Sequence, residues 1–277
     1  MGNRSRTTSW STAEKYGFGA LALALVLFFF QPATAAIPLV IFLLLCFGAP
    51  FFPRSSFFLP VISHAGAATE GISLTFDDGP SPASTPLLLD LLARHQLPAT
   101  FFVVGENAAR HPELIAAILA GGHTIGNHSL RHDYFLMLRA PKTLQADIRA
   151  TQEILAKSGV IPLVFRPPVG ITSPHLGRVL AGENLIAVTY SCRAFDRGNR
   201  DIHDLAGRIL RRLRPGAIVM LHDLPPQQKN QKDQWQQELD RFFSVLKETN
   251  QVVPLAEIIQ EPVMRLLRGH EEHEEKN

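Results

Sequence analysis

The chain has 277 residues, of which 46% are hydrophobic and 19% are charged, so it can supply the core of a domain of about 200 residues. This composition excludes a disordered protein. The formal charge is +2 and the basic residues are dispersed, which excludes binding to nucleic acid through a long basic stripe. Two cysteines, Cys46 and Cys192, are too few for a disulfide framework and do not indicate a redox compartment.

The first informative feature is the segment 16–53, which contains no Asp, Glu, Lys, Arg or His and is typical of a membrane segment. As one helix it would extend roughly 57 Å, whereas the hydrocarbon core of a bilayer is roughly 30 Å thick. The polar break at 31–36 favours a hairpin of two short helices, about 16–30 and 37–52. A single uncleaved anchor and a cleaved signal peptide are the alternatives.

Basic residues flank this segment on both sides, with Arg4, Arg6 and Lys15 before it and Arg54 after it. Positive charge next to a membrane segment favours the cytoplasmic side. A hairpin would therefore place the following domain on the cytoplasmic face of a bacterial inner membrane. A single anchor would place that domain outside, so the side depends on the number of helices.

Changes of composition divide the chain further. We expect a cytoplasmic N-terminus at 1–15, a transmembrane segment at 16–53, a folded domain at 71–260 and a charged tail at 261–277. The segment 54–70 is either a juxtamembrane linker or the first packing segment of the folded domain.

From residue 71 onwards, short apolar runs alternate with helical patterns. The expected strands are 72–76, 99–104, 124–126, 163–166, 185–190, 217–221 and 251–255. The expected helices are 85–95, 112–120, 142–158, 174–181, 202–213 and 234–249. This alternation predicts an α/β fold with a parallel sheet, and about seven repeats favour a closed or nearly closed barrel. Active residues should then lie at the carboxyl ends of the strands.

The first expected strand ends in Thr-Phe-Asp-Asp-Gly-Pro, which is residues 75–80. Adjacent carboxylates at a strand end point to different sides, and the Gly-Pro turn holds both near the mouth of the barrel. Asp77 and Asp78 could thus have different tasks, because one acid can bind a cation while its neighbour takes a proton. An isolated Asp-Asp pair would more simply be two exposed loop acids.

A second segment, His-Ser-Leu-Arg-His, spaces His128 and His132 by four residues, so both imidazoles can face one point if the segment is a helical turn. Two histidines and one aspartate make a three-ligand site with room for water. That is the pattern of a hydrolytic metal centre, whereas a structural site would use four protein ligands, usually including cysteine. Histidine pairs at this spacing also occur by chance on surface helices.

Three later segments also carry polar residues at or just after the end of an expected strand. Arg166 ends a strand and precedes Pro-Pro, a stiff turn that can present the amide N–H of Val169 to a developing oxyanion. His222 ends an apolar run and is placed to act as a general acid, with Asp196 available to orient and charge it.

These segments resemble, in this order, the motif series of the polysaccharide deacetylase family, also called the NodB homology domain or carbohydrate esterase family 4. The matching motifs are Thr-Phe-Asp-Asp-Gly-Pro, His-Ser-x-x-His, Arg-Pro-Pro-x-Gly, a fourth segment with Asp196, and Leu-His-Asp, over about residues 72–259. The resemblance implies a distorted (β/α) barrel. It also implies one divalent metal ion, usually zinc, held by Asp78, His128 and His132.

The same resemblance implies roles for the remaining residues. Asp77 would be the catalytic base, kept ionised by Arg166. His222 would protonate the leaving amine and would be oriented by Asp196. Leu221 would line the acyl pocket.

The backbone of Val169 would complete the oxyanion hole, although an aromatic residue usually stands at this position of the motif. The fourth motif of the family commonly has a tryptophan and two acids, of which this chain keeps only Asp196. These departures bear on pocket shape and substrate, and leave the metal site unaffected.

The sequence therefore predicts a membrane-anchored, metal-dependent hydrolase that removes an N-acyl (acetyl) group from an amino sugar of a glycan or lipid-linked saccharide. The alternative is a membrane-anchored carbohydrate-binding protein with an inactive site, although no ligand or acid is missing. A phosphohydrolase is disfavoured, because the strand ends carry no phosphate-binding group and the arginines of 208–214 are expected on a solvated helix face. No nucleic-acid partner is expected, and no protein partner can be inferred.

Overall fold

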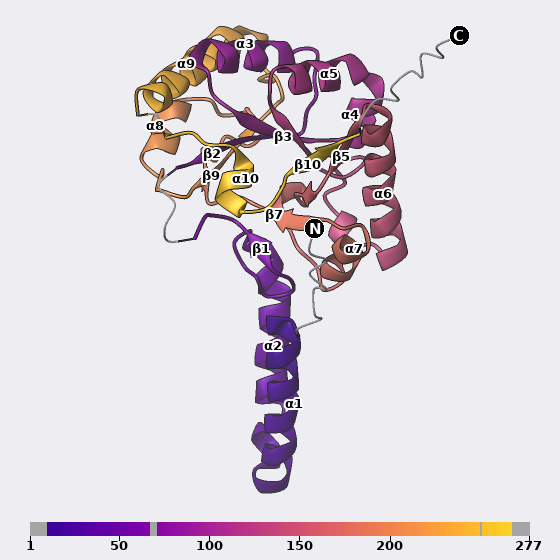
Figure 1. Ribbon diagram of the computed structural model, residues 1–277. Helices are drawn as coiled ribbons and strands as arrows, with labels where there is room; N and C mark the ends of the chain where they lie inside the picture. Colours follow the sequence, from indigo (N-terminus) through magenta and orange to yellow (C-terminus); the bar gives the residue numbers. More distant parts are fainter. Residues whose placement is uncertain (1–9, 67–70, 250, 268–277) are drawn as a thin grey trace, which may run out of the picture.

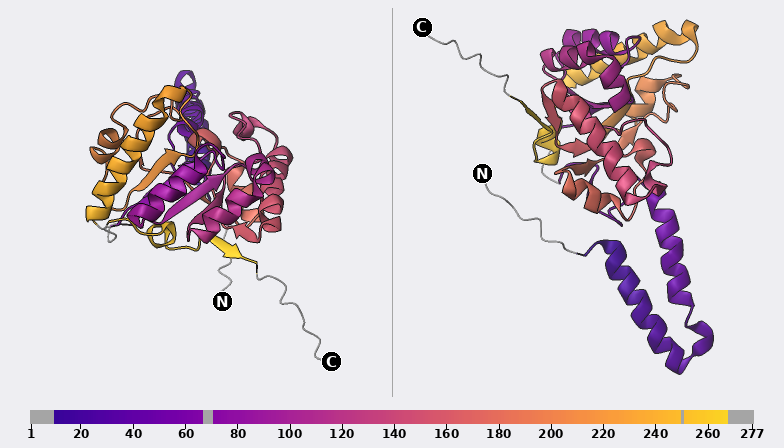
Figure 2. Two further views of the ribbon diagram at one scale, coloured as in Figure 1. Left: turned by 90° about the horizontal axis from the view of Figure 1, so that it is seen from above. Right: turned by 90° about the vertical axis from the view of Figure 1, so that its right-hand side faces the viewer.

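The computed structural model describes residues 10–66, 71–249 and 251–267. Two antiparallel helices project as a hairpin from one end of an α/β domain (Figure 1, Figure 2). The basic residues at positions 4 and 6 and the acidic residues beyond 267 lie outside the described residues. The α/β class and the two helices that precede the domain are as the sequence predicts.

The hairpin consists of α1 (Thr12–Phe30) and α2 (Ile37–Gly48), joined by the short helix η1 (Pro32–Thr34), and α2 continues into η2 (Ala49–Phe51). Most of its phenylalanine and leucine side chains are exposed. Both helical segments are long and apolar enough to cross a membrane. By length and composition they suit a membrane anchor or a signal sequence, and the polar break between them gives the turn.

Eight parallel strands form one curled sheet in the order β1-β7-β6-β4-β3-β2-β9-β8. Among the described strands β1 and β8 do not pair with each other, so the barrel stays open between them. The bounds are β1 (Val61–Ile62), β2 (Ser73–Asp77), β3 (Ala99–Val103), β4 (Thr124–Asn127), β6 (Val164–Phe165), β7 (Ile186–Val188), β8 (Cys192–Arg193) and β9 (Ile218–His222).

Helices cover the outside of this sheet, and a small antiparallel pair, β5 (Val160–Pro162) with β10 (Met264–Leu266), lies beside it. The main core is the layer between the sheet and the helices, where aromatic side chains from both are buried. The helices are α3 (Thr85–His95), α4 (Gly105–Arg110), α5 (Pro112–Ala120), α6 (Pro141–Lys157), α7 (Leu176–Gly182), α8 (Leu205–Leu210), α9 (Lys232–Thr249) and α10 (Leu255–Ile259), with the short turns η3 (Leu136–Leu138), η4 (Pro168–Gly170) and η5 (Lys229–Gln231).

The predicted strand at 251–255 is wrong. Val252 makes a single bridge to Ile72, and Pro254 forms the N-cap of α10. Proline has no N–H to donate to a ladder, so the segment pairs at one residue and then turns into a helix. The two-residue edge strands β1 and β8 are additions that the apolar pattern did not indicate.

The segment between the hairpin and β2 packs against the domain. Phe58 and Leu59 are buried in a hydrophobic cluster with side chains of α7, and β1 extends the sheet beside β7. The backbone N–H of Ala13 donates to the carbonyl of Phe57 at 2.8 Å. Both ends of the hairpin are therefore tied to the α/β domain.

Candidate active site

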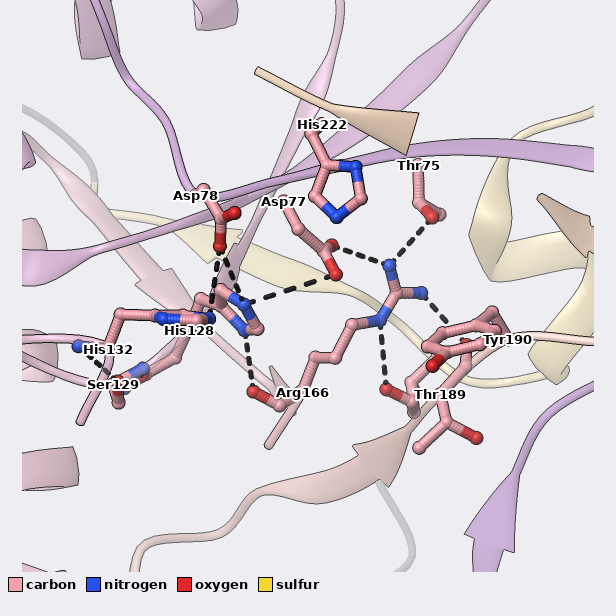
Figure 3. A network of polar contacts seen from close by, with 12 residues as sticks. Thr75, Asp77, Asp78, His128, Ser129, His132, Arg166, Thr189, Tyr190 and His222 are labelled. Atoms are coloured by element: carbon pink, nitrogen blue, oxygen red, sulfur yellow. Dashed lines mark hydrogen bonds and ion pairs between the residues drawn. The ribbon is translucent and has the colours of Figure 1, made fainter. Parts of the chain in front are cut away.

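The carboxyl ends of four strands of the sheet, β6, β4, β2 and β9, bring the predicted residues together, as Figure 3 shows. Asp77 ends β2, His222 ends β9, and the two are register partners in adjacent strands. His128 directly follows β4, and Arg166 directly follows β6. Parallel strands share one carboxyl edge, so residues far apart in the sequence meet at this edge.

Asp78, His128 and His132 form a three-residue group whose potential ligand atoms all lie within 4.8 Å of one another. Asp78 Oδ1 is 3.3 Å from Nε2 of His128 and 3.1 Å from Nε2 of His132. This oxygen is buried and accepts no hydrogen bond among the described residues. An unpaired carboxylate oxygen beside two imidazole nitrogens fits a divalent cation, because a cation would satisfy all three donor atoms.

Electrostatics favour the ionised form of the aspartate. Burial raises the pKa of Asp78, but the close imidazoles of His128 and His132 outweigh burial and hold it well below the ordinary value. The carboxylate is thus available as an anionic ligand across the neutral pH range.

A backbone contact sets the orientation of His128. Its Nδ1 donates to the carbonyl of Arg166 at 2.7 Å. Because a carbonyl can only accept, the proton lies on Nδ1 and the lone pair lies on Nε2, the atom that faces Asp78. Metal-binding histidines are commonly fixed by such a contact on the second ring nitrogen.

The segment 128–132 is not the helical turn that the histidine spacing suggested. Ser129 and His132 have φ angles of 70° and 54°, so the chain reverses in the left-handed region. The side chain of Asn127 accepts from the backbone N–H of Ser129 at 2.9 Å, and Ser129 Oγ accepts from that of His132 at 3.0 Å. These two side-chain contacts, in place of helical periodicity, aim both imidazoles at Asp78.

Asp77 is held from the opposite side by Arg166. Nη1 of the arginine donates to Asp77 Oδ1 at 2.7 Å and to Thr75 Oγ1 at 2.7 Å, while Nη2 donates to the carbonyl of Thr189 at 2.9 Å. The guanidinium also lies 3.9 Å from the centre of the Phe102 ring. Both charged groups are buried, so the ion pair compensates charges that would be costly alone.

His222 pairs with Asp196 at the end of β9. Its Nδ1 lies 2.9 Å from Asp196 Oδ2, and the same carboxylate oxygen accepts from the backbone N–H of Asn199 at 3.1 Å. Burial opposes a charged imidazole, but the hydrogen bond and charge of Asp196 outweigh it and raise the pKa of His222 to about 9. The free Nε2 of this imidazole faces the same space as Asp77 (Figure 3).

The remaining two predicted residues lie in different surroundings. Val169 is in η4 with a φ of 52° and is 45% exposed, at the rim of the sheet edge. Leu221 is 2% exposed and packs in the main core, on the side of β9 that faces the helices. Successive strand residues point to opposite faces, so Leu221 and His222 are separated. The acyl-pocket role expected for Leu221 stays a prediction.

Asp223 is a structural part of the site that sequence reasoning did not assign. Its side chain is fully buried and accepts from Ser84 Oγ at 2.7 Å and Thr85 Oγ1 at 2.6 Å, and its backbone N–H donates to the carbonyl of Asp77 at 2.7 Å. Burial raises its pKa to about 6. A Cβ at Gly79 would collide with the Asp223 carboxylate, so only glycine allows this approach. The acid after the Leu-His pair was the available sequence signal.

Comparison with known proteins identifies the family. A family model described as polysaccharide deacetylase matches residues 65–184. A chitooligosaccharide deacetylase of Bradyrhizobium sp. (strain ANU 289) is 36% identical over 162 residues, which are 58% of this chain and 74% of the relative. The chain belongs to the polysaccharide deacetylase family. By family it is a hydrolase that deacetylates carbohydrates.

Other members of the polysaccharide deacetylase family support the same assignment. A peptidoglycan-N-acetylglucosamine deacetylase of Bacillus cereus is 34% identical over 154 residues, covering 55% of this chain and 72% of the relative. The crystal structure of the Bc1960 peptidoglycan N-acetylglucosamine deacetylase superposes with a TM-score of 0.67 at 29% identity, covering 74% of this chain and 95% of that one. The curled parallel sheet is thus the fold of this family, and the hairpin lies outside the matched family region.

Proposed function

We propose that this polysaccharide deacetylase is a membrane-anchored, metal-dependent enzyme that removes the N-acetyl group from an amino sugar of a glycan or lipid-linked saccharide. The observation that carries the proposal is the meeting of an Asp-His-His group, a buried carboxylate and a charged histidine at one sheet edge. Relatives named for chitooligosaccharide and for peptidoglycan N-acetylglucosamine support the N-acetylated amino sugar as substrate class.

Asp78, His128 and His132 would hold the divalent ion, which we propose to be zinc because two imidazoles and one carboxylate are a common zinc ligand set. Three protein ligands leave coordination positions open, as in catalytic sites. The bound ion supplies Lewis-acid chemistry, lowering the pKa of water and polarising the amide carbonyl.

Asp77 is proposed as the general base. Arg166 occupies its Oδ1, which leaves Oδ2 to accept a proton. Oδ2 lies 4.0 Å from Nε2 of His128, so it faces the proposed ligand group. The same contact with Arg166 fixes the carboxylate in one orientation, and a fixed base needs no reorganisation during the reaction.

His222 is proposed as the general acid that protonates the departing amine. With a pKa of about 9 it carries its proton at neutral pH, and Asp196 keeps its ring oriented. The backbone amide of Val169, a half-exposed residue at the rim, is proposed to donate to the oxyanion as the carbonyl is attacked.

The proposal is tested by metal content and acetate release from an N-acetylglucosamine oligosaccharide. His128→Ala and His132→Ala should each lose metal and activity together while the protein stays folded, because the core does not depend on this site. Asp77→Asn should keep the metal and lose about 10²- to 10⁴-fold in kcat, because an amide cannot take the proton.

Stoichiometric metal in both histidine variants would contradict the ligand assignment. Binding of the oligosaccharide without any acetate release by the metal-loaded wild-type protein would instead favour an inactive carbohydrate-binding protein.

A further inference from the structure

The length of the hairpin limits how far the domain can stand from a bilayer. Helix α1 has 19 residues, or about 28 Å at 1.5 Å per residue, close to the roughly 30 Å of the hydrocarbon core. Figure 1 and Figure 2 show the hairpin projecting away from the domain, with no described helix or strand of the domain beside its far half. When the hairpin is inserted in a bilayer, its ends at Ser11 and Phe52 therefore lie at the headgroups, and no spacer lifts the domain.

The end of the hairpin contacts the edge of the sheet that carries the active site. The carbonyl of Pro53 accepts from Thr189 Oγ1 at 2.7 Å, and the Pro53 ring packs so closely on Gly170 that a Cβ there would lie 3.0 Å from its Cγ. Thr189 follows β7, and its own carbonyl accepts from Arg166, which holds Asp77. Two residues in contact, Thr189 and Arg166, therefore connect Pro53 at the level of the lipid headgroups with the candidate base.

The side chains at the base of the hairpin are of the kinds that favour the level of the lipid headgroups. Trp10, Phe51 and Phe52 are each more than half exposed, and aromatic residues favour the membrane interface. Arg54 and Arg178 are exposed cations near the two ends of the hairpin, and such cations attract anionic headgroups. Arg178 lies on α7 and reaches α1 only through a long contact of 3.9 Å with Glu14.

A groove of about 710 Å³ opens between the hairpin and α7. Its walls along the hairpin are apolar apart from Ser11 and Glu14 next to the domain, and its domain end carries polar and charged side chains. Lining residues include Trp10, Phe18, Phe42, Phe58, His175 and Arg178. Apolar walls at hydrocarbon depth and a cation at headgroup depth match the two parts of an anionic lipid.

We infer that the substrate is an N-acyl amino sugar attached to an anionic lipid in the same membrane, with its lipid chain in this groove and its headgroup at Arg178. This inference rests on the proposed function and names the acceptor. A sugar attached to a membrane lipid is confined to the surface that holds the enzyme, so its effective concentration at the sheet edge is high. A soluble oligosaccharide has to reach the same edge from the bulk solution.

The test uses the full chain, loaded with zinc, in vesicles of phosphatidylglycerol and phosphatidylcholine. Acetate release is measured from a synthetic N-acetylglucosaminyl-phosphate lipid in those vesicles and from soluble tetra-N-acetylchitotetraose at the same bulk sugar concentration. We expect the initial rate with the lipid to be at least about tenfold higher. Asp77→Asn should abolish both rates, which ties them to one site.

A charge-reversed pair, Arg54→Glu with Arg178→Glu, should lower the ratio of lipid to soluble rates by about fivefold or more, since each cation near an anionic surface contributes about that factor. Lys232→Glu with Lys247→Glu is the matched control. These exposed lysines lie on α9, across the domain from the hairpin (Figure 1), and their reversal should leave the ratio unchanged.

Equal or faster release from the soluble oligosaccharide by the wild type would overturn the inference and leave the proposed function standing. An unchanged ratio in the arginine pair would overturn the headgroup site at Arg178. No acetate from either substrate would overturn the proposed function itself.

Discussion

Neighbouring carboxylates in one strand end serve different partners here. Asp77 continues the extended strand and meets a buried guanidinium, whereas Asp78 has a φ of 75° and turns its carboxylate towards two imidazoles. A non-glycine residue in the left-handed region is conformationally costly, and such residues concentrate at functional sites. The backbone reversal at Asp78 is what separates the two acids.

The pairing of His222 with Asp196 should be visible in the pH dependence of turnover. The pKa of His222 is raised above the ordinary 6.5 to about 9, so the acid form is lost as pH rises through about 9. Asp196→Asn removes the anion that stabilises the imidazolium, and the alkaline limb of kcat against pH should move down by at least about one unit. An alkaline limb that does not move would mean that another group donates the proton.

The same raised pKa affects stability with a definite sign. The folded state binds the His222 proton more tightly than the unfolded chain, so this stabilisation is complete below about 6.5 and is lost as pH rises through about 9. Thermal unfolding of the wild type and Asp196→Asn across this range would check it, with the difference between them shrinking at high pH.

Asp223 is expected to stabilise the loop before α3. Asp223→Ala leaves two buried hydroxyls, those of Ser84 and Thr85, without their acceptor, at a cost of about 1–3 kcal/mol in the free energy of unfolding. Denaturant unfolding measures this cost, and kcat should fall as well because the same loop begins at Asp78. Serine-to-alanine replacement at the more exposed Ser81 is the control, and an equal loss of stability there would contradict the assignment.

The sequence predicted that Asp77, Asp78, His128, Arg166 and His222 meet, because each of them ends or directly follows an apolar run that becomes a strand. It did not predict how the residues are held. Ser129 and Asn127 shape the histidine loop through side-chain contacts, and Thr189 positions Arg166 through a backbone carbonyl. Such contacts depend on the path of loops, which apolar periodicity does not encode.

The two-residue strand β1 gives no clear pattern in the sequence, yet it covers the edge of the sheet at β7. It pairs with β7 through only two residues, and Phe58 and Leu59 before it are buried beside α7. Removing them would expose a strand edge and the apolar surface beneath, which promotes association between chains.

Two truncations separate these contributions. A chain that lacks residues 1–52 keeps Phe58, Leu59 and β1 and should fold as a monomer, whereas one that lacks residues 1–66 should lose about 3–6 kcal/mol from the two apolar side chains alone. Light scattering after size exclusion and thermal unfolding would measure both effects. Equal stability and equal monomer content in the two chains would show that β1 is dispensable.

The longer elements were predictable because their patterns are long. Helices α3 and α5 occupy the predicted ranges, and an amphipathic stripe identified α6. Two-residue strands such as β1 and β8 carry no period, and their pairing comes from the strands that they adjoin. The segment 251–255 failed for the opposite reason, since its apolar residues suggested a strand that Pro254 prevents.

A hairpin of two membrane-spanning helices predicts that the segment before α1 and the domain after α2 lie on the same side of the membrane. The basic residues at both flanks favour the cytoplasm. Reporters that work only in the cytoplasm should be active after residue 70, and reporters that work only outside should be active within 31–36. An externally active reporter after residue 70 would contradict the hairpin and place the domain with extracellular polysaccharide.

The pairing of Val61 with Ala187 also sets an order of events during biosynthesis. These partners are 126 positions apart, so at about 5–20 residues per second the ribosome needs roughly 6–25 s to supply β7 after β1. The apolar hairpin leaves the ribosome long before that moment. With the hairpin inserted as proposed, β1 would be held at the lipid surface before β7 is made, so the sheet would be completed next to the membrane.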